Sequence, residues 1–237
     1  MPDGWVWAAL VGYALGSMSA ARLVARRRLR GEDLSTTSYD VGGLGFSVEA
    51  RGVSPGSVGA RAGARAGGLA TLGDIAKAAV AVGAVWAWLG RDAAAVAGAG
   101  AVLGHVAPIQ HRFRGAFGQS PIIGAAVVLS PLSIPFAVVA AAGASWALAE
   151  VVIGTTLWTL FLIAWGWWRD DPTFMWFAVA ANAIYLTRVA PQLAQRVRFR
   201  RTTRPDVCAR WGEILHTYRS RPFDPPSGTS GGGDPPD

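Results

Sequence analysis

The chain has 237 residues, of which 51% are hydrophobic and only 16% are charged. Soluble domains carry about 25% charged residues, because their surface faces water. The low charge content and the positive mean hydropathy of +0.31 exclude an ordinary soluble globular domain. Both features favour a protein whose outer surface faces lipid.

Basic residues outnumber acidic ones by 22 to 15, and only Lys77 among them is a lysine. They are not interleaved with aromatic residues as a single-stranded nucleic-acid site requires, so we expect no nucleic-acid partner. The arginines instead flank apolar runs, as in membrane proteins whose positive loops lie in the cytoplasm. The one cysteine, Cys208, allows neither an internal disulfide nor a metal cluster, and we expect no metal and no cofactor.

The first apolar run covers residues 5–24 and is followed by arginines at 26–28 and 30. A signal peptide carries positive charge before its apolar stretch, not after it. The run therefore predicts a membrane-spanning helix whose N-terminus lies outside and whose basic end lies in the cytoplasm. Residues 31–68 are rich in Gly, Ser and Arg and predict a long cytoplasmic loop.

Later apolar runs complete the predicted membrane domain. Those at 69–89 and 93–109 predict the second and third crossings, while region 122–168 holds either two ordinary helices or three short ones. The last run, 174–185, precedes a second arginine cluster that should be cytoplasmic, which favours three short helices. These lie near 121–133, 134–148 and 150–167. The sequence thus predicts an all-α integral membrane fold of about seven crossings, with a cytoplasmic C-terminus.

The predicted domain organisation is one transmembrane domain, 1–200, followed by a tail, 201–237. The tail is basic at first and then rich in Pro, Gly and Ser. Such a composition cannot bury apolar surface, so we expect the final stretch to be disordered. The basic part is interpreted as a topology signal, and binding to anionic lipid heads is the alternative.

Two cytoplasmic segments have a composition that suits anions. In the Gly-rich stretch 52–61, followed by Arg65, glycines let backbone N–H groups approach an anion and arginine clamps phosphate through two bonds. The second segment, 104–118, contains His105, Arg112 and Arg114. Arginines with flanking glycines suit a phosphorylated substrate. The alternatives are a flexible linker for the first segment and a topology-determining loop for the second.

Asp74 and Lys77 lie near the start of the second apolar run. At positions i and i+3 they share one helix face and can pair. Ionisable groups near a membrane face are costly and often functional. The alternative is a lysine that reaches toward the interface beside a partner carboxylate.

In order and spacing these segments resemble the bacterial acyl-phosphate:glycerol-3-phosphate acyltransferases, the PlsY-type enzymes, over most of residues 12–196. The matching residues are Gly16, Ser17, Ala25, Arg26, Gly56, Gly59, Ala60, Arg65, Asp74, Lys77, Gly104, His105, Pro108, Phe113, Gly115, Gly118, Arg188 and Arg196. Other family positions differ here. Its loop serine falls on Pro55, an asparagine on Ala62, the second lysine of its phosphate loop on Phe117 and a histidine on Val189. An insertion lies near 34–47, as is typical of tolerated loop growth.

The resemblance implies a bacterial multi-pass protein of the plasma membrane. It would transfer a fatty acyl group from acyl phosphate to glycerol 3-phosphate, giving lysophosphatidic acid, with membrane lipids around it. The implied catalytic residues are His105, Arg65 and Ser57. The implied substrate-binding residues are Ser54, Gly56, Gly59, Asp74, Lys77, Gly104, Arg112, Arg114, Gly115, Gly118 and Arg188. Because several family residues are replaced, two alternatives stay open: a catalytically degenerate relative that binds a lipid or phosphorylated metabolite, and a small transporter.

Overall fold

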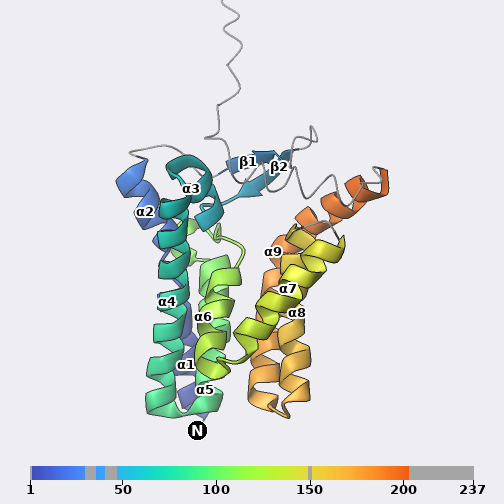
Figure 1. Ribbon diagram of the computed structural model, residues 1–237. Helices are drawn as coiled ribbons and strands as arrows, with labels where there is room; N and C mark the ends of the chain where they lie inside the picture. The colour runs from blue at the N-terminus through green and yellow to red at the C-terminus, as the bar shows by residue number, and fades with distance from the viewer. Residues whose placement is uncertain (1, 30–35, 41–46, 149–150, 203–237) are drawn as a thin grey trace, which may run out of the picture.

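The computed structural model describes residues 2–29, 36–40, 47–148 and 151–202. It is a bundle of helices with a small β-hairpin at one end (Figure 1). The helices are α1 (Pro2–Ser17), α2 (Ala20–Arg28), α3 (Pro55–Ala62), α4 (Ala64–Leu89), α5 (Arg91–Val106), α6 (Gln119–Leu129), α7 (Ser133–Leu148), α8 (Val151–Trp168) and α9 (Pro172–Thr202), with a 3₁₀ turn, η1 (Ile109–His111).

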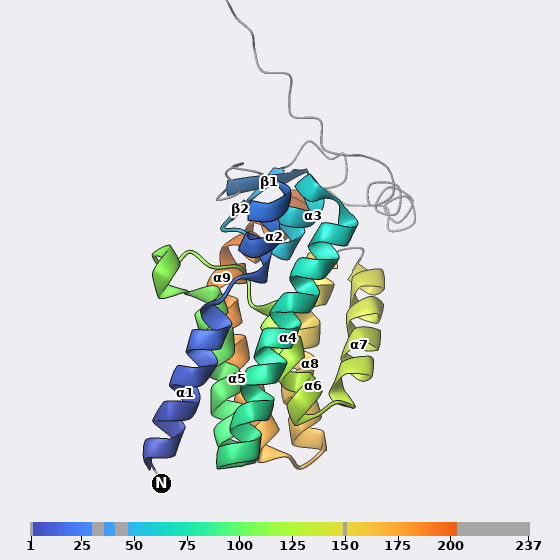
Figure 2. The ribbon, with the colours of Figure 1, turned by 90° about the vertical axis from the view of Figure 1, so that its left-hand side faces the viewer.

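Helices α1 and α5 lie side by side with their backbones in contact (Figure 2). Gly12 and Gly16 of α1, and Gly100 and Gly104 of α5, form two small-xxx-small motifs, which let membrane helices approach closely. A Cβ atom on Gly104 would lie only 2.2 Å from the carbonyl oxygen of Tyr13. Glycine is therefore required at this contact, which fixes the end of α1 against the end of α5.

Two groups of helices make up the bundle, α1, α4, α5 and α6 in one and α7, α8 and α9 in the other (Figure 1). Helix α9 packs against both α8 and α5 and so joins the groups. Gly98 of α5 lies against the ring of Phe177 of α9. The core at this junction contains the fully buried side chains of Ile122, Leu162 and Phe174.

The outer surface of the bundle is suited to lipid. Within the described residues, four helical segments are long and apolar enough to cross a membrane: Asp3–Arg28, Ala64–Leu89, Arg91–His111 and Pro172–Ala194. Exposed tryptophans gather where α1 and α9 begin and α4 and α8 end, namely Trp5, Trp7, Trp88, Trp167, Trp168 and Trp176. Tryptophan favours the membrane–water boundary, and the chain is a multi-pass membrane protein. We call this end of the bundle the tryptophan end and the opposite one the site end.

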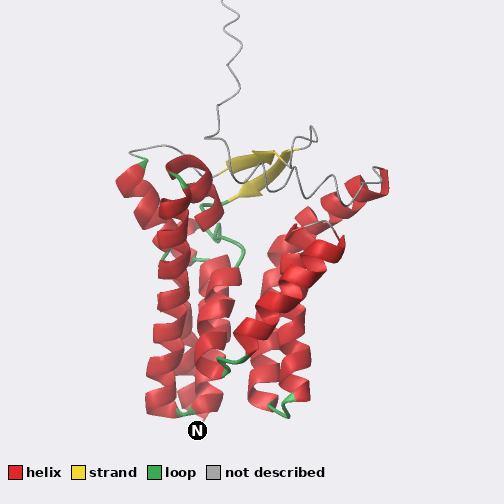
Figure 3. Cartoon of the chain, viewed as in Figure 1, coloured by secondary structure: helices red, strands yellow, loops and turns green. Residues whose placement is uncertain are grey.

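The structure corrects the predicted loop over residues 31–68. It contains an antiparallel hairpin of β1 (Thr36–Asp40) and β2 (Ser47–Arg51), with Thr36 opposite Arg51 (Figure 3). The short helix α3 follows, and α4 begins at Ala64, earlier than its apolar run. The predicted all-α fold therefore holds for the bundle, but a two-stranded sheet is added to it.

Other boundaries also differ from those expected. The first apolar run is broken into α1 and α2, and the last belongs to a helix of 31 residues, α9. Three helices, α6, α7 and α8, occupy the region predicted to hold three short ones. Residues 203–237, most of the predicted tail, and the centre of the predicted insertion, 41–46, lie outside the described residues.

Candidate active site

The site is built around the break between α1 and α2. The Ser19 side chain caps α2 by accepting a hydrogen bond from the Arg22 backbone N–H at 3.2 Å. Ser17 turns back to donate to the carbonyl oxygen of Tyr13. Met18 lies in the break, between the two helices, and its carbonyl oxygen accepts a hydrogen bond from Lys77 of α4.

A buried polar cluster faces this break. Asp74 is fully buried, and its Oδ1 lies 2.8 Å from Lys77 Nζ and 3.3 Å from the Ala20 backbone nitrogen. Lys77 Nζ also lies 2.9 Å from Nδ1 of His105, near the end of α5. The cluster therefore joins α1, α2, α4 and α5 at one point. Its charge pairing offsets part of the cost of burying ionised groups away from water.

The loop from 107 to 118 folds back over the end of α5. Gly115 and Ala116 donate backbone hydrogen bonds to the carbonyl oxygens of Val106 and His105, both at 3.2 Å. A Cβ atom on Gly115 would lie 2.0 Å from the His105 oxygen, so only glycine permits this return. The phenol of Tyr13 donates to the Ala107 carbonyl and anchors the loop to α1.

Two arginines from other helices hold the same loop through its backbone. Arg22 of α2 donates to the Arg114 carbonyl at 3.2 Å, and Arg188 of α9 donates to the Gly115 carbonyl at 3.0 Å. The loop itself turns through positive φ at Arg112 and Phe113, 53° and 60°. Residues of α2 and α9 thus help to determine the shape of the predicted phosphate loop.

Helix α3 closes the site from the hairpin side. Ser54 and Ser57 form a capping box, in which each side chain accepts the backbone N–H of the other. Gly52, with a φ of 103°, lies against the Gly115 carbonyl. Val53, which lies between Gly52 and Ser54 in the sequence, lines the cavity of the site. The packing of α3 is what brings this segment to the loop.

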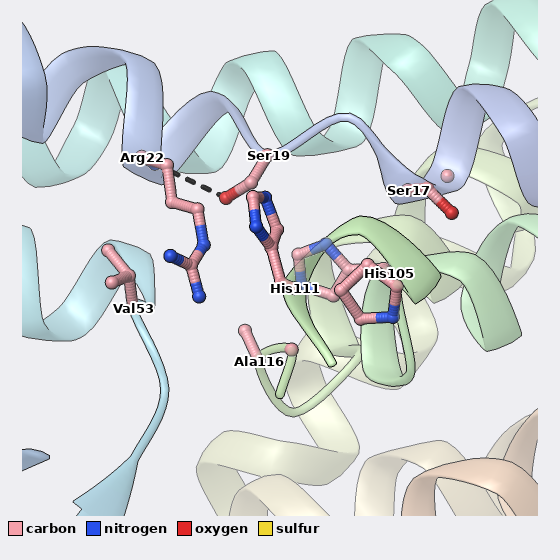
Figure 4. Close-up of a pocket in the computed structure, with 10 residues that line it drawn as sticks. Ser17, Ser19, Arg22, Val53, His105, His111 and Ala116 are labelled. Carbon is pink, nitrogen blue, oxygen red and sulfur yellow. Dashed lines mark hydrogen bonds between the residues drawn. The ribbon is translucent and has the colours of Figure 1, made fainter. Parts of the chain in front are cut away.

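A small cavity opens where these elements meet. Figure 4 shows the Arg22 guanidinium between Val53 and His111, with His105 on the other side of His111, toward Ser17. The lining residues are Gly16, Ser17, Ser19, Arg22, Val53, His105, Pro108, His111, Gly115 and Ala116. Arginine, imidazole and hydroxyl groups around one cavity suit an oxygen-rich anion.

The predicted site residues divide between the cavity and its surroundings. His105 and Gly115 line the cavity, and Asp74 and Lys77 stand directly behind His105. Arg65, Arg112 and Arg114 are exposed and do not line it. The others do not line the cavity and have structural surroundings instead. Ser54 and Ser57 form the capping box, Gly56 lies in α3, Gly59 lies against Gly67, Gly104 against Tyr13, Gly118 against Val106, and Arg188 holds the loop.

Four polar lining residues were not among the predicted site residues: Ser17, Ser19, Arg22 and His111. Ser17 and His111 lie inside segments that the resemblance had already marked. Arg22 had no signal, because it lies just before an arginine cluster interpreted as topological. Among the described residues, no group of three His, Cys, Asp or Glu is placed to hold a metal ion.

Comparisons with known proteins agree on one family. Residues 6–197 match the family model described as glycerol-3-phosphate acyltransferase. The chain is 38% identical over 124 residues to a glycerol-3-phosphate acyltransferase of Paramagnetospirillum magneticum, covering 50% of this chain and 53% of the relative. A second relative, glycerol-3-phosphate acyltransferase 1 of Dehalococcoides mccartyi, is 36% identical over 126 residues, 52% of this chain and 54% of its own length. The chain thus spans about half the length of these curated relatives.

The fold is similar to that of a solved membrane protein. The crystal structure of PlsY (YgiH), an integral membrane glycerol 3-phosphate acyltransferase, in its glycerol 3-phosphate form superposes with a TM-score of 0.69. The match covers 83% of this chain and 93% of that one, at 20% sequence identity. The lysophosphatidic acid form gives a TM-score of 0.68.

Proposed function

The chain belongs to the glycerol-3-phosphate acyltransferase family, and on this premise we propose that it makes lysophosphatidic acid from acyl phosphate and glycerol 3-phosphate. A hydroxyl oxygen of glycerol 3-phosphate bonds to the acyl carbon, the bond from that carbon to the phosphate oxygen breaks, and inorganic phosphate leaves. The hydroxyl proton passes to the leaving phosphate or to water. Because the donor is already activated, positioning and charge stabilisation carry the catalysis.

The cavity beside His105 is the observation that carries this proposal. It combines one guanidinium, two imidazoles and two hydroxyls with the Gly115 loop, which suits the phosphate oxygens shared by both substrates. Arg22 holds the loop and lines the cavity at once. We place glycerol 3-phosphate against His105 and the loop 112–118, with Arg112, Arg114 and Arg188 supplying positive charge around it.

The acyl-phosphate donor is placed on the side of α3. Ser54, Ser57, Gly56, Gly59 and Arg65 border this side, and Arg65 is exposed and able to reach an anion. Ser57 contributes through the capping box that orients α3, rather than as a nucleophile, because its hydroxyl donates to the Ser54 carbonyl at 2.8 Å. Asp74 and Lys77 support the cavity from behind His105.

The proposed topology has seven crossings in the cell membrane, by α1, α4, α5, α6, α7, α8 and α9. The site end carries nearly all described arginines, whereas the tryptophan end carries only Arg91 and Arg169. This asymmetry supports a cytoplasmic site end, an external N-terminus and a cytoplasmic C-terminus. The domain 1–200 would contain the whole site, and the tail 201–237 would lie in the cytoplasm.

A binding protein without catalysis is the second candidate, favoured by one observation. Phe117, at the position of a family lysine, packs against the apolar core, so one phosphate ligand is lost. The loss of a charge-assisted hydrogen bond is worth roughly 1.5–3 kcal/mol. Arg22 adds a cation to the same cavity, and for this reason we favour the active enzyme.

An acyltransferase assay on the purified protein tests the proposal. Acyl phosphate and labelled glycerol 3-phosphate are supplied in lipid micelles, and labelled lysophosphatidic acid is measured. We expect product from the wild type and a loss of roughly 10- to 100-fold in kcat/KM for Arg22→Ala and Arg114→Ala. Arg28→Ala, an exposed neighbour on α2, is the matched control and should retain activity. No product from folded, monodisperse wild type would overturn catalysis and favour the binding protein.

A further inference from the structure

Lys77 meets three acceptors with the three donors of its ammonium group. These are Asp74 Oδ1 at 2.8 Å, the Met18 carbonyl oxygen and His105 Nδ1 at 2.9 Å. An ammonium group has three N–H bonds and no lone pair, so each contact must be a donation from lysine. The buried Asp74 carboxylate pairs with this amine, and a negative charge at that distance favours the ammonium form.

The contact with Lys77 determines where the His105 proton lies. Because Nδ1 accepts from an ammonium, it must carry the lone pair, and the ring proton of neutral imidazole must be on Nε2. A proton on Nδ1 would direct two N–H groups at each other across 2.9 Å. A charged imidazolium would also stand beside the lysine cation in a buried site. The structure is therefore consistent with the neutral Nε2–H form.

The other ring nitrogen is open to the cavity. Each hydrogen bond or ion pair that the structure gives the His105 ring is made through Nδ1. Among described residues only Asp74 Oδ2 and Asn182 Oδ1 are fully buried side-chain atoms without a partner, so Nε2 is not sealed in the core. Since His105 lines the cavity (Figure 4) and Nδ1 is taken by Lys77, Nε2 is the ring nitrogen left for a bound molecule.

We propose that His105 is a catalytic hydrogen-bond donor and that Lys77 is the positioning residue that fixes its Nε2–H tautomer. His105 then donates to a substrate oxygen that carries or gains negative charge, the phosphate or the acyl carbonyl, without taking a proton. With Nδ1 occupied and Nε2 protonated, the ring has no lone pair facing the cavity. His105 therefore cannot be the general base for the glycerol hydroxyl. This inference rests on the proposed acyl transfer.

Two substitutions of His105 separate a donor from a base. The amide nitrogen of glutamine reaches about as far as Nε2, whereas that of asparagine reaches only about as far as Nδ1. We expect His105→Gln to keep kcat within about tenfold of wild type, while His105→Asn and His105→Leu lose about 100-fold or more, as for a lost transition-state donor. Gln variants as inactive as Asn and Leu, with all three folded, would overturn the donor role.

Nitrogen-15 NMR of histidine-labelled protein in micelles tests the tautomer without any activity. Loss of one imidazole spin system in His105→Gln assigns the signal among the three histidines of the chain. At neutral pH we expect the His105 proton on Nε2, and a proton on Nδ1 would overturn the role of Lys77. If wild type makes no product, the catalytic role fails together with the proposed function, while the spectrum still decides the tautomer.

A double variant tests positioning as distinct from folding. Asp74→Asn/Lys77→Met replaces both charged side chains by neutral ones of similar size. No buried charge is left unpaired, so we expect the bundle to fold. We expect the His105 signal to show both tautomers and kcat to fall by at least tenfold, with a smaller change in KM. A spectrum unchanged from wild type would show that Lys77 does not determine the tautomer.

Discussion

The two ends of the bundle each carry an ion pair, but the pairs differ in burial and in what they leave open. At the site end Asp74 is fully buried and Lys77 nearly so, with side-chain exposures of 0% and 10%. At the tryptophan end, Asp171 and Arg91 pair with exposures of 19% and 34%. Both pairs join segments where a helix begins or breaks.

The Arg91–Asp171 pair at the tryptophan end, which we call the clasp, connects three segments of the chain. Arg91, the first residue of α5, donates to Asp171 at 2.8 Å and to the Leu129 carbonyl at 3.1 Å, joining the start of α5, the end of α6 and the turn before α9. Asp171 also accepts the backbone N–H of Phe174. Both terminal nitrogens of Arg91 and both carboxylate oxygens of Asp171 therefore have hydrogen-bond partners within the protein. The site-end pair instead contacts the imidazole of His105, and in our proposal this contact makes it a functional pair rather than a purely structural one.

The largest effect is expected where the buried pair is broken. Asp74→Ala leaves the Lys77 ammonium buried without its counter-charge, which should lower the free energy of unfolding by about 3–5 kcal/mol. Chemical unfolding in micelles, followed by tryptophan fluorescence, measures it. Asp171→Ala is the matched change at the other end. If the two variants lose the same stability, the distinction between the ends is wrong.

Backbone contact at the site end gives the next effect. Gly104→Ala places a methyl group 2.2 Å from the Tyr13 carbonyl oxygen, so α1 and α5 must separate. Overpacking of this kind costs about 1–3 kcal/mol. Thermal unfolding should show a lower midpoint and the acyltransferase assay a lower rate. Gly83→Ala is the control, because its Cβ meets nothing within 4 Å, and it should be neutral or stabilising. Equal effects of the two changes would mean that the α1–α5 contact is looser than described.

The smallest effect concerns the clasp and depends on pH. Hydrogen bonds from Arg91 hold the pKa of Asp171 below its ordinary value. A carboxyl group whose pKa is lowered by folding stabilises the protein above its unfolded pKa, about 3.9, and loses that contribution as pH falls through the folded value. Asp171→Asn should therefore cost about 0.2–1 kcal/mol at pH 7, and the difference from wild type should shrink below about pH 4.

Unfolding curves of wild type and Asp171→Asn between pH 7 and 3 measure this change. Asp170→Asn, at the exposed neighbouring position, should leave the curve unaltered. A difference between wild type and Asp171→Asn that stays constant as the pH falls would contradict a charge-based role for Asp171.

Local patterns in the sequence were sufficient for much of the helical architecture. Apolar runs predicted α4, α5, α6, α7 and α8, because a helix that crosses a bilayer must be hydrophobic along its own length. The hairpin of Thr36–Asp40 and Ser47–Arg51 was missed because the Gly-, Ser- and Arg-rich composition of residues 31–68 is typical of a loop. The helix break at Ser17–Ser19 was missed because hydropathy is averaged over a window of residues, so a change of backbone direction at one or two positions leaves no signal.

The site shows the same division more sharply. The sequence by itself marked His105, Gly115, Asp74 and Lys77, because their types and spacing are local. Only the tertiary structure decided that Arg22 and His111 share one cavity with His105 and Gly115, and that Arg112 and Arg114 stay outside it. It also decided that Lys77 Nζ lies 2.9 Å from His105 Nδ1. Those outcomes depend on close contact between α1, α4 and α5. A contact across 28 residues between two helices is set by packing, which no single segment of sequence contains.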